Sequence, residues 1–394
     1  MKNKNILIIV HKGYNEFDWL SPIIKNLQKK NNIFYLFTNN VAYVSFVKDT
    51  KGNFFLSKAK KKMIIIKYNF IILRILRVFY KRLPFLKNQK IENYFVSNIH
   101  DISKISKYLL SINKKEFDII FSQNGLTSGW TNQFYLNKKR TVIINHPATS
   151  NLPSKHARIP SKARPRGDYM FVNNDIEKKL WQKKFDENKI IVVGMPKLNF
   201  YNPPNKRSNL IKRIVFAYTS NFKKFGLKKD SIIEKQLDET LQVLSKIGNI
   251  KVNLKIHPIK NHPYYLKILA KYDKRIFSVS NENLNNLAYK SDLLITNLDS
   301  SAVLDGLLGK IPTIELWRVL KEINTYSHSF FSTNLLSKYC KNKYELKKYV
   351  ELGLKFPKNL IWQRQQMQFK KIYNYKKINY DYLLNKFLKK MKHN

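Results

Sequence analysis

Short apolar runs alternate with longer amphipathic segments along the first half of the chain. The runs that predict buried strands lie at residues 5–10, 33–37, 118–121, 141–145, 169–172 and 190–193. Helical patterns occupy residues 16–30, 93–111 and 176–186. Short apolar runs separated by helix-length segments are typical of parallel strands with helices on both faces. This half of the chain therefore predicts an α/β domain of βαβ units.

The same pattern restarts in the second half. Predicted strands lie at residues 214–218, 251–256, 276–279, 293–296 and 313–316, with helices at 232–246, 264–271, 284–289 and 302–308. We expect two Rossmann-like βαβ domains that face each other across a cleft. In open α/β sheets, ligands bind at the carboxyl ends of the strands, so function is sought in the loops that follow strands.

A proline-rich stretch, GMPKLNFYNPPNKRSN at residues 194–209, separates the two halves. Because its prolines do not fit inside regular elements, it is the best linker in the chain. We expect an N-terminal domain at residues 1–195, a linker at 196–212 and a C-terminal domain at 213–356. The tail at 357–394 is basic and helical in pattern, and it could cross back to brace the N-terminal domain.

The composition is that of a packed and strongly basic protein. Hydrophobic residues make up 43% of the 394 residues, and 74 Lys and Arg against 26 Asp and Glu give a formal net charge of +48. This charge attracts polyanions or anionic lipid, unless it is solvated surface spread over every face. The single cysteine, Cys340, excludes an internal disulfide framework and a multi-cysteine metal site. The N-terminus enters a strand without a signal-peptide pattern, which predicts a cytoplasmic protein.

Residues 58–87 combine apolar and basic residues in one stretch, KAKKKMIIIKYNFIILRILRVFYKRLPFLK. A membrane span needs about 20 apolar residues without charges such as Lys67, Arg74 and Arg77. The stretch fits a basic amphipathic helix in the headgroup plane of an anionic leaflet, which predicts a peripheral location at the inner membrane. The alternative is a core strand plus a helix that covers the sheet, with cations that reach solvent.

An acid and two small hydroxyls follow the predicted strand at 293–296. A helix that begins near Ser301 would offer unpaired N–H groups and a partial positive charge to a phosphate, and the hydroxyls of Ser300 and Ser301 add donors. Asp305, one turn further on, could accept hydrogen bonds from ribose hydroxyls. The alternative for Asp299 or Ser300 is an ordinary helix N-cap.

A histidine, His257, ends the predicted strand at 251–256 and is followed by a proline. Its imidazolium could reach a diphosphate and stabilise the charge that builds on a departing nucleotide, as a metal does elsewhere. The sequence shows no paired carboxylates of the Asp-x-Asp kind, so we expect no metal and no cofactor.

Several motifs together resemble a known family. KIHP at 255–258, SDLLIT at 291–296 and SSAVLDGLLGKIP at 300–312 resemble the nucleotide-binding half of the CDP-glycerol glycerophosphotransferases of teichoic acid synthesis. More broadly, they are similar to GT-B transferases and UDP-N-acetylglucosamine 2-epimerases. In the first half, INHPATS at 144–150 and VVGMPKLN at 192–199 resemble further motifs of the family.

The resemblance implies a GT-B-like fold, with a nucleotide-activated donor held as substrate by the C-terminal domain and an acceptor near the N-terminal one. It also implies roles for individual residues. His146 would be the general base for the acceptor hydroxyl, a role that suits an imidazole at neutral pH, and the alternative is a structural histidine. His257 would bind the donor's phosphates, Ser300 and Ser301 would cradle the diphosphate, and Asp305 would contact sugar hydroxyls.

Two departures from the family pattern concern the substrate more than the fold. Pro147 follows His146 where the family has a glycine, and the approach Asn297-Leu298-Asp299 to the two serines is one residue longer than usual.

Three functions remain open from the sequence. The leading hypothesis is a transferase that moves a glycosyl or polyol-phosphate group from a nucleotide donor to a cell-surface polysaccharide or lipid-linked acceptor. The second is a UDP-N-acetylglucosamine 2-epimerase-like enzyme, which should need no membrane contact and should carry further acids. The third is a basic nucleic-acid-binding protein; a nucleic-acid partner is not expected, because no recognisable nucleic-acid module occurs.

Overall fold

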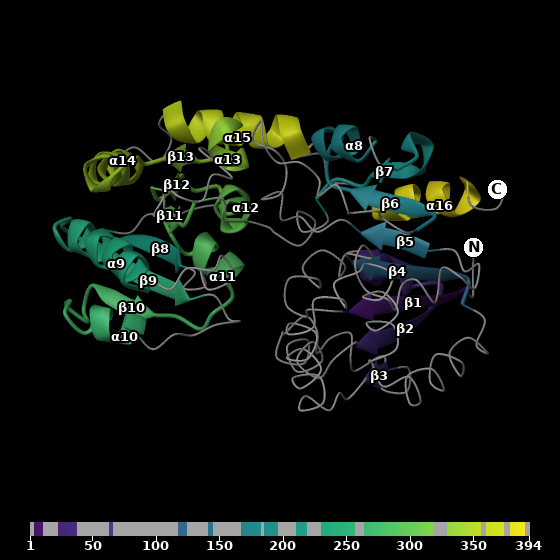
Figure 1. The fold of residues 1–394 in the computed structure, drawn as a ribbon, viewed down its shortest axis with the longest axis horizontal. Helices are drawn as coiled ribbons and strands as arrows, with labels where there is room; N and C mark the ends of the chain where they lie inside the picture. Colours follow the sequence, from purple (N-terminus) through teal and green to yellow (C-terminus); the bar gives the residue numbers. More distant parts are fainter. Residues whose placement is uncertain are drawn as a thin grey trace, which may run out of the picture. The chain divides into compact units, whose positions relative to one another are not determined.

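The computed structural model describes residues 4–10, 23–37, 63–65, 117–123, 141–144, 167–182, 185–195, 210–218, 230–256, 264–298, 300–317, 329–355, 360–373 and 379–390. They divide into two compact units. Unit 1 contains the described residues up to 195 together with 379–390, and unit 2 contains those from 210 to 373. Each unit consists of a sheet with helices packed on it (Figure 1).

Unit 1 is built on a seven-stranded parallel sheet. Its strands are β1 (Asn5–Val10), β2 (Asn32–Phe37), β3 (Met63–Ile65), β4 (Ile119–Gln123), β5 (Thr141–Ile144), β6 (Tyr169–Val172) and β7 (Ile190–Val192). Their order across the sheet is β3-β2-β1-β4-β5-β6-β7. The first strand, β1, lies inside the sheet, and the direction in which successive strands are added reverses between β1 and β4, as in doubly wound folds.

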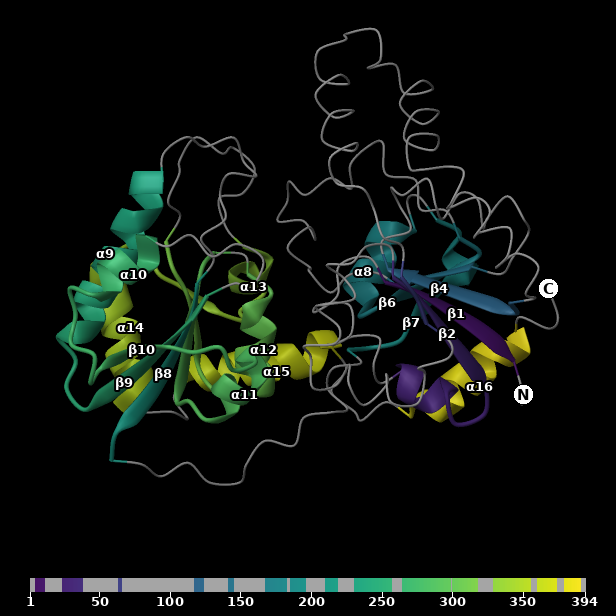
Figure 2. The ribbon, with the colours of Figure 1, turned by 90° about the horizontal axis from the view of Figure 1, so that it is seen from below.

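The core of unit 1 is completed by the last described helix of the chain, α16 (Tyr380–Lys390). Leu384, Phe387 and Leu388 of α16 are buried against the apolar residues of the sheet. The ring of Phe387 meets those of Tyr169 and Phe171 edge-on, with centroids 5.1 Å apart in both pairs. The described part of unit 1 therefore depends on chain segments from both ends of the sequence (Figure 2).

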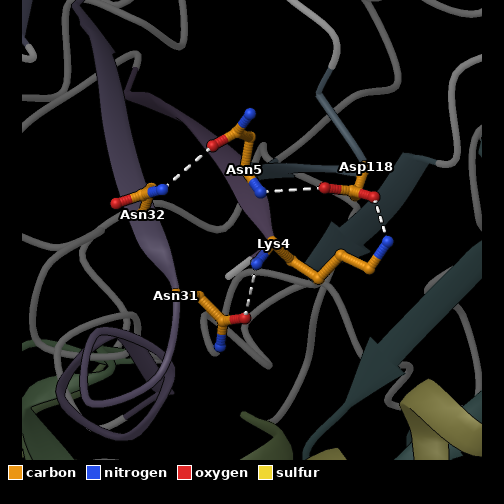
Figure 3. A network of polar contacts seen from close by, with 5 residues as sticks. All are labelled: Lys4, Asn5, Asn31, Asn32 and Asp118. Carbon is orange, nitrogen blue, oxygen red and sulfur yellow. Dashed lines mark hydrogen bonds and ion pairs between the residues drawn. The ribbon is translucent and has the colours of Figure 1, made fainter. Parts of the chain in front are cut away.

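A network of polar groups connects the amino ends of the central strands in unit 1 (Figure 3). Asp118, just before β4, accepts hydrogen bonds from the backbone N–H of Asn5 at 2.8 Å and pairs with the Lys4 ammonium at 2.5 Å. Asp118 also donates its own backbone N–H to the Asn5 carbonyl at 2.9 Å. Asn31 and Asn32 bond to Lys4 and Asn5, which brings the start of β2 into the same network.

Unit 2 repeats this device at its own amino edge. Asp292, just before the corresponding strand, accepts a hydrogen bond from the Arg213 N–H at 2.8 Å and returns one to the Arg213 carbonyl at 2.7 Å. Asp118 and Asp292 both exchange hydrogen bonds with the backbone of the neighbouring strand at the amino edge of their sheet, so these polar residues have a structural role. The carboxyl edges are the places to look for a ligand.

Unit 2 is built on a six-stranded parallel sheet. Its strands are β8 (Lys212–Tyr218), β9 (Ile250–Ile256), β10 (Phe277–Val279), β11 (Leu293–Thr296), β12 (Thr313–Glu315) and β13 (Lys338–Tyr339). The order β10-β9-β8-β11-β12-β13 is the Rossmann order, with the reversal between β8 and β11.

Helices cover both faces of the unit 2 sheet (Figure 1). One face packs against α9 (Asp230–Ser245) and α14 (Lys343–Lys355), through residues such as Leu241 and Val350. The other face packs against α11 (Leu284–Tyr289) and α12 (Ala302–Leu308), where Val215 and Leu294 meet Leu287. The other labelled α-helices of unit 2 are α10 (Tyr264–Leu269), α13 (Phe330–Thr333) and α15 (Leu360–Tyr373).

The expected strands and helices that fall on described residues are mostly present, with a few corrections. The helix expected at 176–186 is α8 (Asp175–Trp181), with Gln182 as its C-cap. Asp186 instead caps the following 3-10 turn (Glu187–Lys189) by accepting from Asn188 N–H. The expected helix at 93–111 lies outside the described residues.

Of the stretch at 58–87, only β3 is described, and it pairs in parallel with β2. Those three residues are therefore strand, and the rest of the expected amphipathic helix lies outside the described residues. Within the part of the chain that the structure describes, no helix has the length and apolarity to cross a membrane.

Candidate functional site

The reversal of strand order in unit 2 marks the crevice where doubly wound folds bind ligands. There β8 and β11 pair in parallel, from Leu293 beside Ile214 to Thr296 beside Ala217 at the carboxyl edge. The predicted residues Ser300 and Ser301 follow the end of β11 at Thr296 after three intervening residues and precede α12. The β11–α12 junction is therefore the candidate site.

Backbone N–H groups at this junction are bonded within the chain. The Ser300 hydroxyl accepts from Ala302 N–H at 3.3 Å, and the Ser300 and Ser301 carbonyls accept from Val303 and Leu304 N–H, each at 3.1 Å. The expectation of unpaired N–H groups is therefore wrong for these three donors, because α12 is a short, seven-residue helix that begins with tight turns. Ser300 acts as a local cap, whereas the Ser301 side chain makes no capping bond.

A glycine sets how closely α12 approaches the sheet. A Cβ at Gly306 would clash with the Thr313 hydroxyl and lie 3.3 Å from Leu294 Cβ, so no larger residue fits without a shift. The tight packing holds the second half of α12 against the first residue of β12 and against Leu294 of β11. Asp305 is only 6% exposed, whereas Ser300 and Ser301 are half-buried.

Buried amides connect three elements on the opposite face of the same edge. Asn297, the residue after β11, donates to the Gln236 side-chain carbonyl on α9 at 3.4 Å. Gln236 donates in turn to the Trp317 carbonyl after β12 at 2.6 Å. Both amide side chains are buried. This chain of bonds holds the carboxyl ends of β11 and β12 in a fixed relation.

A fully buried carboxylate, Glu315, ends β12. It accepts hydrogen bonds from the hydroxyls of Ser329 at 2.6 Å and of Ser337. A buried carboxylate needs such donors, because an unpaired charge in the interior is very costly. Glu315 thus connects the end of β12 to the segments before α13 and β13. The sequence offered a signal for it: an acid inside the apolar run of a predicted strand.

At the carboxyl edge of unit 1, the described junction is that of β6 with α8. Asn174 caps α8 by accepting from Glu177 N–H at 2.9 Å, and the Glu177 carboxylate accepts from Asn173 N–H at 2.8 Å. Glu177 is fully buried. Because both groups are used by this capping arrangement, the junction has a structural role.

The structure places only part of the predicted site. Ser300, Ser301 and Asp305 lie together at the start of α12. His146, His257 and Asp299 lie outside the described residues, so their proximity to these groups stays a prediction. Among the described residues, no cluster of three or more His, Cys, Asp or Glu side chains could hold a metal ion.

Two Rossmann-like units with parallel sheets define the class of the protein as GT-B, and solved structures of that fold are similar over nearly the whole chain. The S. aureus MnaA–UDP structure has 12% identity and a TM-score of 0.62, covering 99% of this chain and 97% of the other. The UDP-GlcNAc 2-epimerase of Neisseria meningitidis bound to UDP-GlcNAc has 12% identity and a TM-score of 0.57, covering 98% and 100%. The calicheamicin glycosyltransferase has 11% identity and a TM-score of 0.54, covering 95% of each chain. At such identities the likeness is one of fold.

The family is given by a match of sequence. The model of the CDP-glycerol:poly(glycerophosphate) glycerophosphotransferase family matches residues 104–329, more than half of the chain. No curated protein matches the chain. The chain belongs to this glycerophosphotransferase family, and it is a transferase that uses a nucleotide-activated donor.

Proposed function

We propose that the protein transfers a glycosyl or polyol-phosphate group from a nucleotide-diphosphate donor to a cell-surface polysaccharide or lipid-linked acceptor. The observation that carries the proposal is the β11–α12 junction, which lies at the strand-order reversal of unit 2 and inside the family match. The family's own description names a polymer of glycerophosphate, which supports a polymer acceptor.

The proposed chemistry assigns one role to each predicted residue. His146 takes the proton of the acceptor hydroxyl, whose oxygen then attacks the transferred group. The bond between that group and the nucleotide's phosphate breaks, and His257 stabilises the charge on the leaving phosphate. The Ser300 and Ser301 hydroxyls bind the donor's diphosphate, and Asp305 binds hydroxyls of the donor. The protein needs no metal or cofactor in this scheme.

A panel of nucleotides tests donor binding. The melting temperature of the whole protein is measured with CDP, UDP, GDP and CMP compounds. We expect one nucleotide class to raise it, and Ser301→Tyr to abolish the rise by filling the junction. Ser245→Tyr, the same change at an exposed position at the end of α9, is the matched control and should keep the rise. No shift with any nucleotide, together with salt-sensitive DNA binding, would support the nucleic-acid alternative instead.

Product analysis separates the transferase from the epimerase alternative. A transferase releases the nucleotide only when an acceptor is present, whereas an epimerase converts one nucleotide sugar into another without an acceptor. If His146→Ala leaves transfer intact, its role as the base is wrong.

We also propose that the protein works at the inner face of the membrane, and the support is the +48 net charge and the basic, apolar composition of residues 58–87. Co-sedimentation with phosphatidylglycerol vesicles, and not with phosphatidylcholine vesicles, is the expected result. Replacement of Lys60, Lys61 and Lys62 by Glu should weaken it. Equal binding to both vesicle types would contradict the electrostatic part of this proposal.

A further inference from the structure

Strand register brings three side chains into one row at the carboxyl edge of unit 2. Lys255 on β9 pairs with Ala217 on β8, and Ala217 pairs with Thr296 on β11. Side chains of paired residues in a sheet point to the same face, and alternation along β11 gives Thr296 the face of Leu294. Leu294 packs on the side of α11, so the row lies on the face that α11 and α12 cover.

The middle of this row lies at the reversal of strand order, and its side chain is small. Ala217 contributes only a methyl group, between a threonine and a lysine. Neighbouring strands are about 4.8 Å apart, so the backbones of Lys255 and Thr296 are separated by about 10 Å across Ala217. That span is comparable to a diphosphate with its two hydrogen-bonding partners.

Within the part of the chain that the structure describes, the Thr296 hydroxyl has no hydrogen-bond partner, although Thr296 is fully buried. A buried polar group without a partner costs about 1–3 kcal/mol, and native proteins contain few of them. Its place beside the strand-order reversal suggests that the partner is a ligand atom.

Lys255 provides the positive charge of the row. Its ammonium donates to the Asn281 carbonyl at 3.2 Å, which leaves two N–H donors for another acceptor. Burial lowers the pKa of Lys255, and the nearby Glu282 acts in the opposite direction. An ammonium that is partly removed from water interacts more strongly with an anion than a solvated one does.

We propose that Thr296 and Lys255 bind the phosphate groups of the donor from the two sides of Ala217. The proposal rests on the nucleotide-diphosphate donor proposed above. It adds two binding residues, Lys255 on β9 and Thr296 at the end of β11, to the serines that precede α12.

Thr296→Val is the sharpest test, because it removes only the hydroxyl and keeps the shape. If the hydroxyl served stability alone, the variant would melt lower. We expect a melting temperature equal to or above that of the wild type, since no hydrogen bond is lost in the free protein. We also expect CDP affinity, measured by calorimetry, to fall about tenfold or more, and Thr296→Ser to keep it. Wild-type CDP affinity in Thr296→Val overturns its role, whatever its melting temperature.

Lys255→Met tests the charge and has a matched control on the same strand. Lys251 has the same side-chain direction on β9 but lies at the amino end and is exposed, so Lys251→Met should leave binding unchanged. We expect Lys255→Met to weaken CDP about tenfold or more while the affinity for cytidine, which has no phosphate, stays the same. Equal losses in both lysine variants, or a loss for cytidine as large as for CDP, would overturn the proposal.

The two proposals fail in different ways. If the wild-type protein binds neither CDP nor UDP, the proposed function fails. If the wild type binds CDP or UDP and the Thr296 and Lys255 variants bind it equally well, only the present inference fails.

Discussion

At the scale of single residues, Gly306 decides how α12 lies on the sheet. A Cβ at this position would clash with the Thr313 hydroxyl, which belongs to a fully buried residue of β12. We expect Gly306→Ala to lower the free energy of unfolding by about 1–3 kcal/mol, as overpacking of a core does. Urea denaturation of the purified protein measures the loss. Nucleotide affinity should fall with it, because α12, which follows the candidate site, is displaced from the sheet.

Two variants make this prediction specific. Gly248→Ala adds the same methyl group where no atom lies within 4 Å, so it should leave stability unchanged. Thr313→Ala on the Gly306→Ala background removes the clashing hydroxyl and should recover part of the loss. A double variant no more stable than Gly306→Ala would mean that the clash is not the cause.

The residues of the site were predictable only where the signal is local. Ser300 and Ser301 are predictable because hydroxyl residues between a strand and a helix form a local sequence motif. The sequence indicates Thr296 only as the end of a strand, since its missing partner depends on what packs around it. The place of Lys255 beside Ala217 depends on cross-strand register, which the sequence does not give. The position of Glu315 inside an apolar run is visible in the sequence, but its partners Ser329 and Ser337 are not.

At the scale of elements, α15 holds the connection between α12 and β12. The Gln365 amide accepts from the Thr313 N–H at 3.1 Å and donates to the Thr313 carbonyl at 2.8 Å, and it is buried. Gln366 donates to the Leu307 carbonyl at 3.0 Å, and the Trp362 ring N–H donates to the Lys310 carbonyl at 2.9 Å. Side chains of one helix thus satisfy backbone groups of a neighbouring helix, loop and strand.

We expect Gln365→Met to destabilise unit 2, because it keeps the side-chain volume but leaves two buried backbone groups of Thr313 without this partner. The expected loss is about 2–6 kcal/mol, from a penalty of about 1–3 kcal/mol for each of the two groups. Urea denaturation measures it. Gln242→Met, the same change at an exposed position of α9, is the control and should have no effect. A loss below about 0.5 kcal/mol in Gln365→Met would show that other groups satisfy Thr313.

Most elements of unit 2 follow from local pattern, and the exceptions have physical causes. β11 and α12 coincide with the expected residues, because an apolar run followed by hydroxyl residues and closed by Gly-Lys-Ile-Pro is a strong signal. β13 is two residues long and has no apolar run to indicate it. Helix α14 was not expected, although the spacing of Leu346, Val350 and Leu354 is helical and could have revealed it.

At the scale of the whole molecule, the chain leaves unit 1, forms unit 2 and returns. The amino-acid sequence indicates a basic helical tail from residue 357, but this tail contains two helices that pack in different units. Helix α15 belongs to unit 2, where it contacts α12 through Gln366, and α16 belongs to unit 1. Which unit a helix joins depends on long-range packing, which a local pattern does not contain.

This chain path predicts that one substitution near the C-terminus acts on the N-terminal sheet. Phe387 is 2% exposed and packs its ring against Tyr169 and Phe171 of β6. Phe387→Ala should cost about 3–5 kcal/mol, as truncation of a buried phenylalanine does. Amide hydrogen exchange should become faster in β6 and β1, and stay unchanged in β8 and β11, because no core residue of unit 2 is touched.

Tyr382→Ala, which removes a ring that is 66% exposed, is the control and should leave exchange in both sheets as it was. Faster exchange throughout unit 2 in Phe387→Ala would mean that the two units unfold together, whereas an effect confined to unit 1 means that each sheet has its own stability.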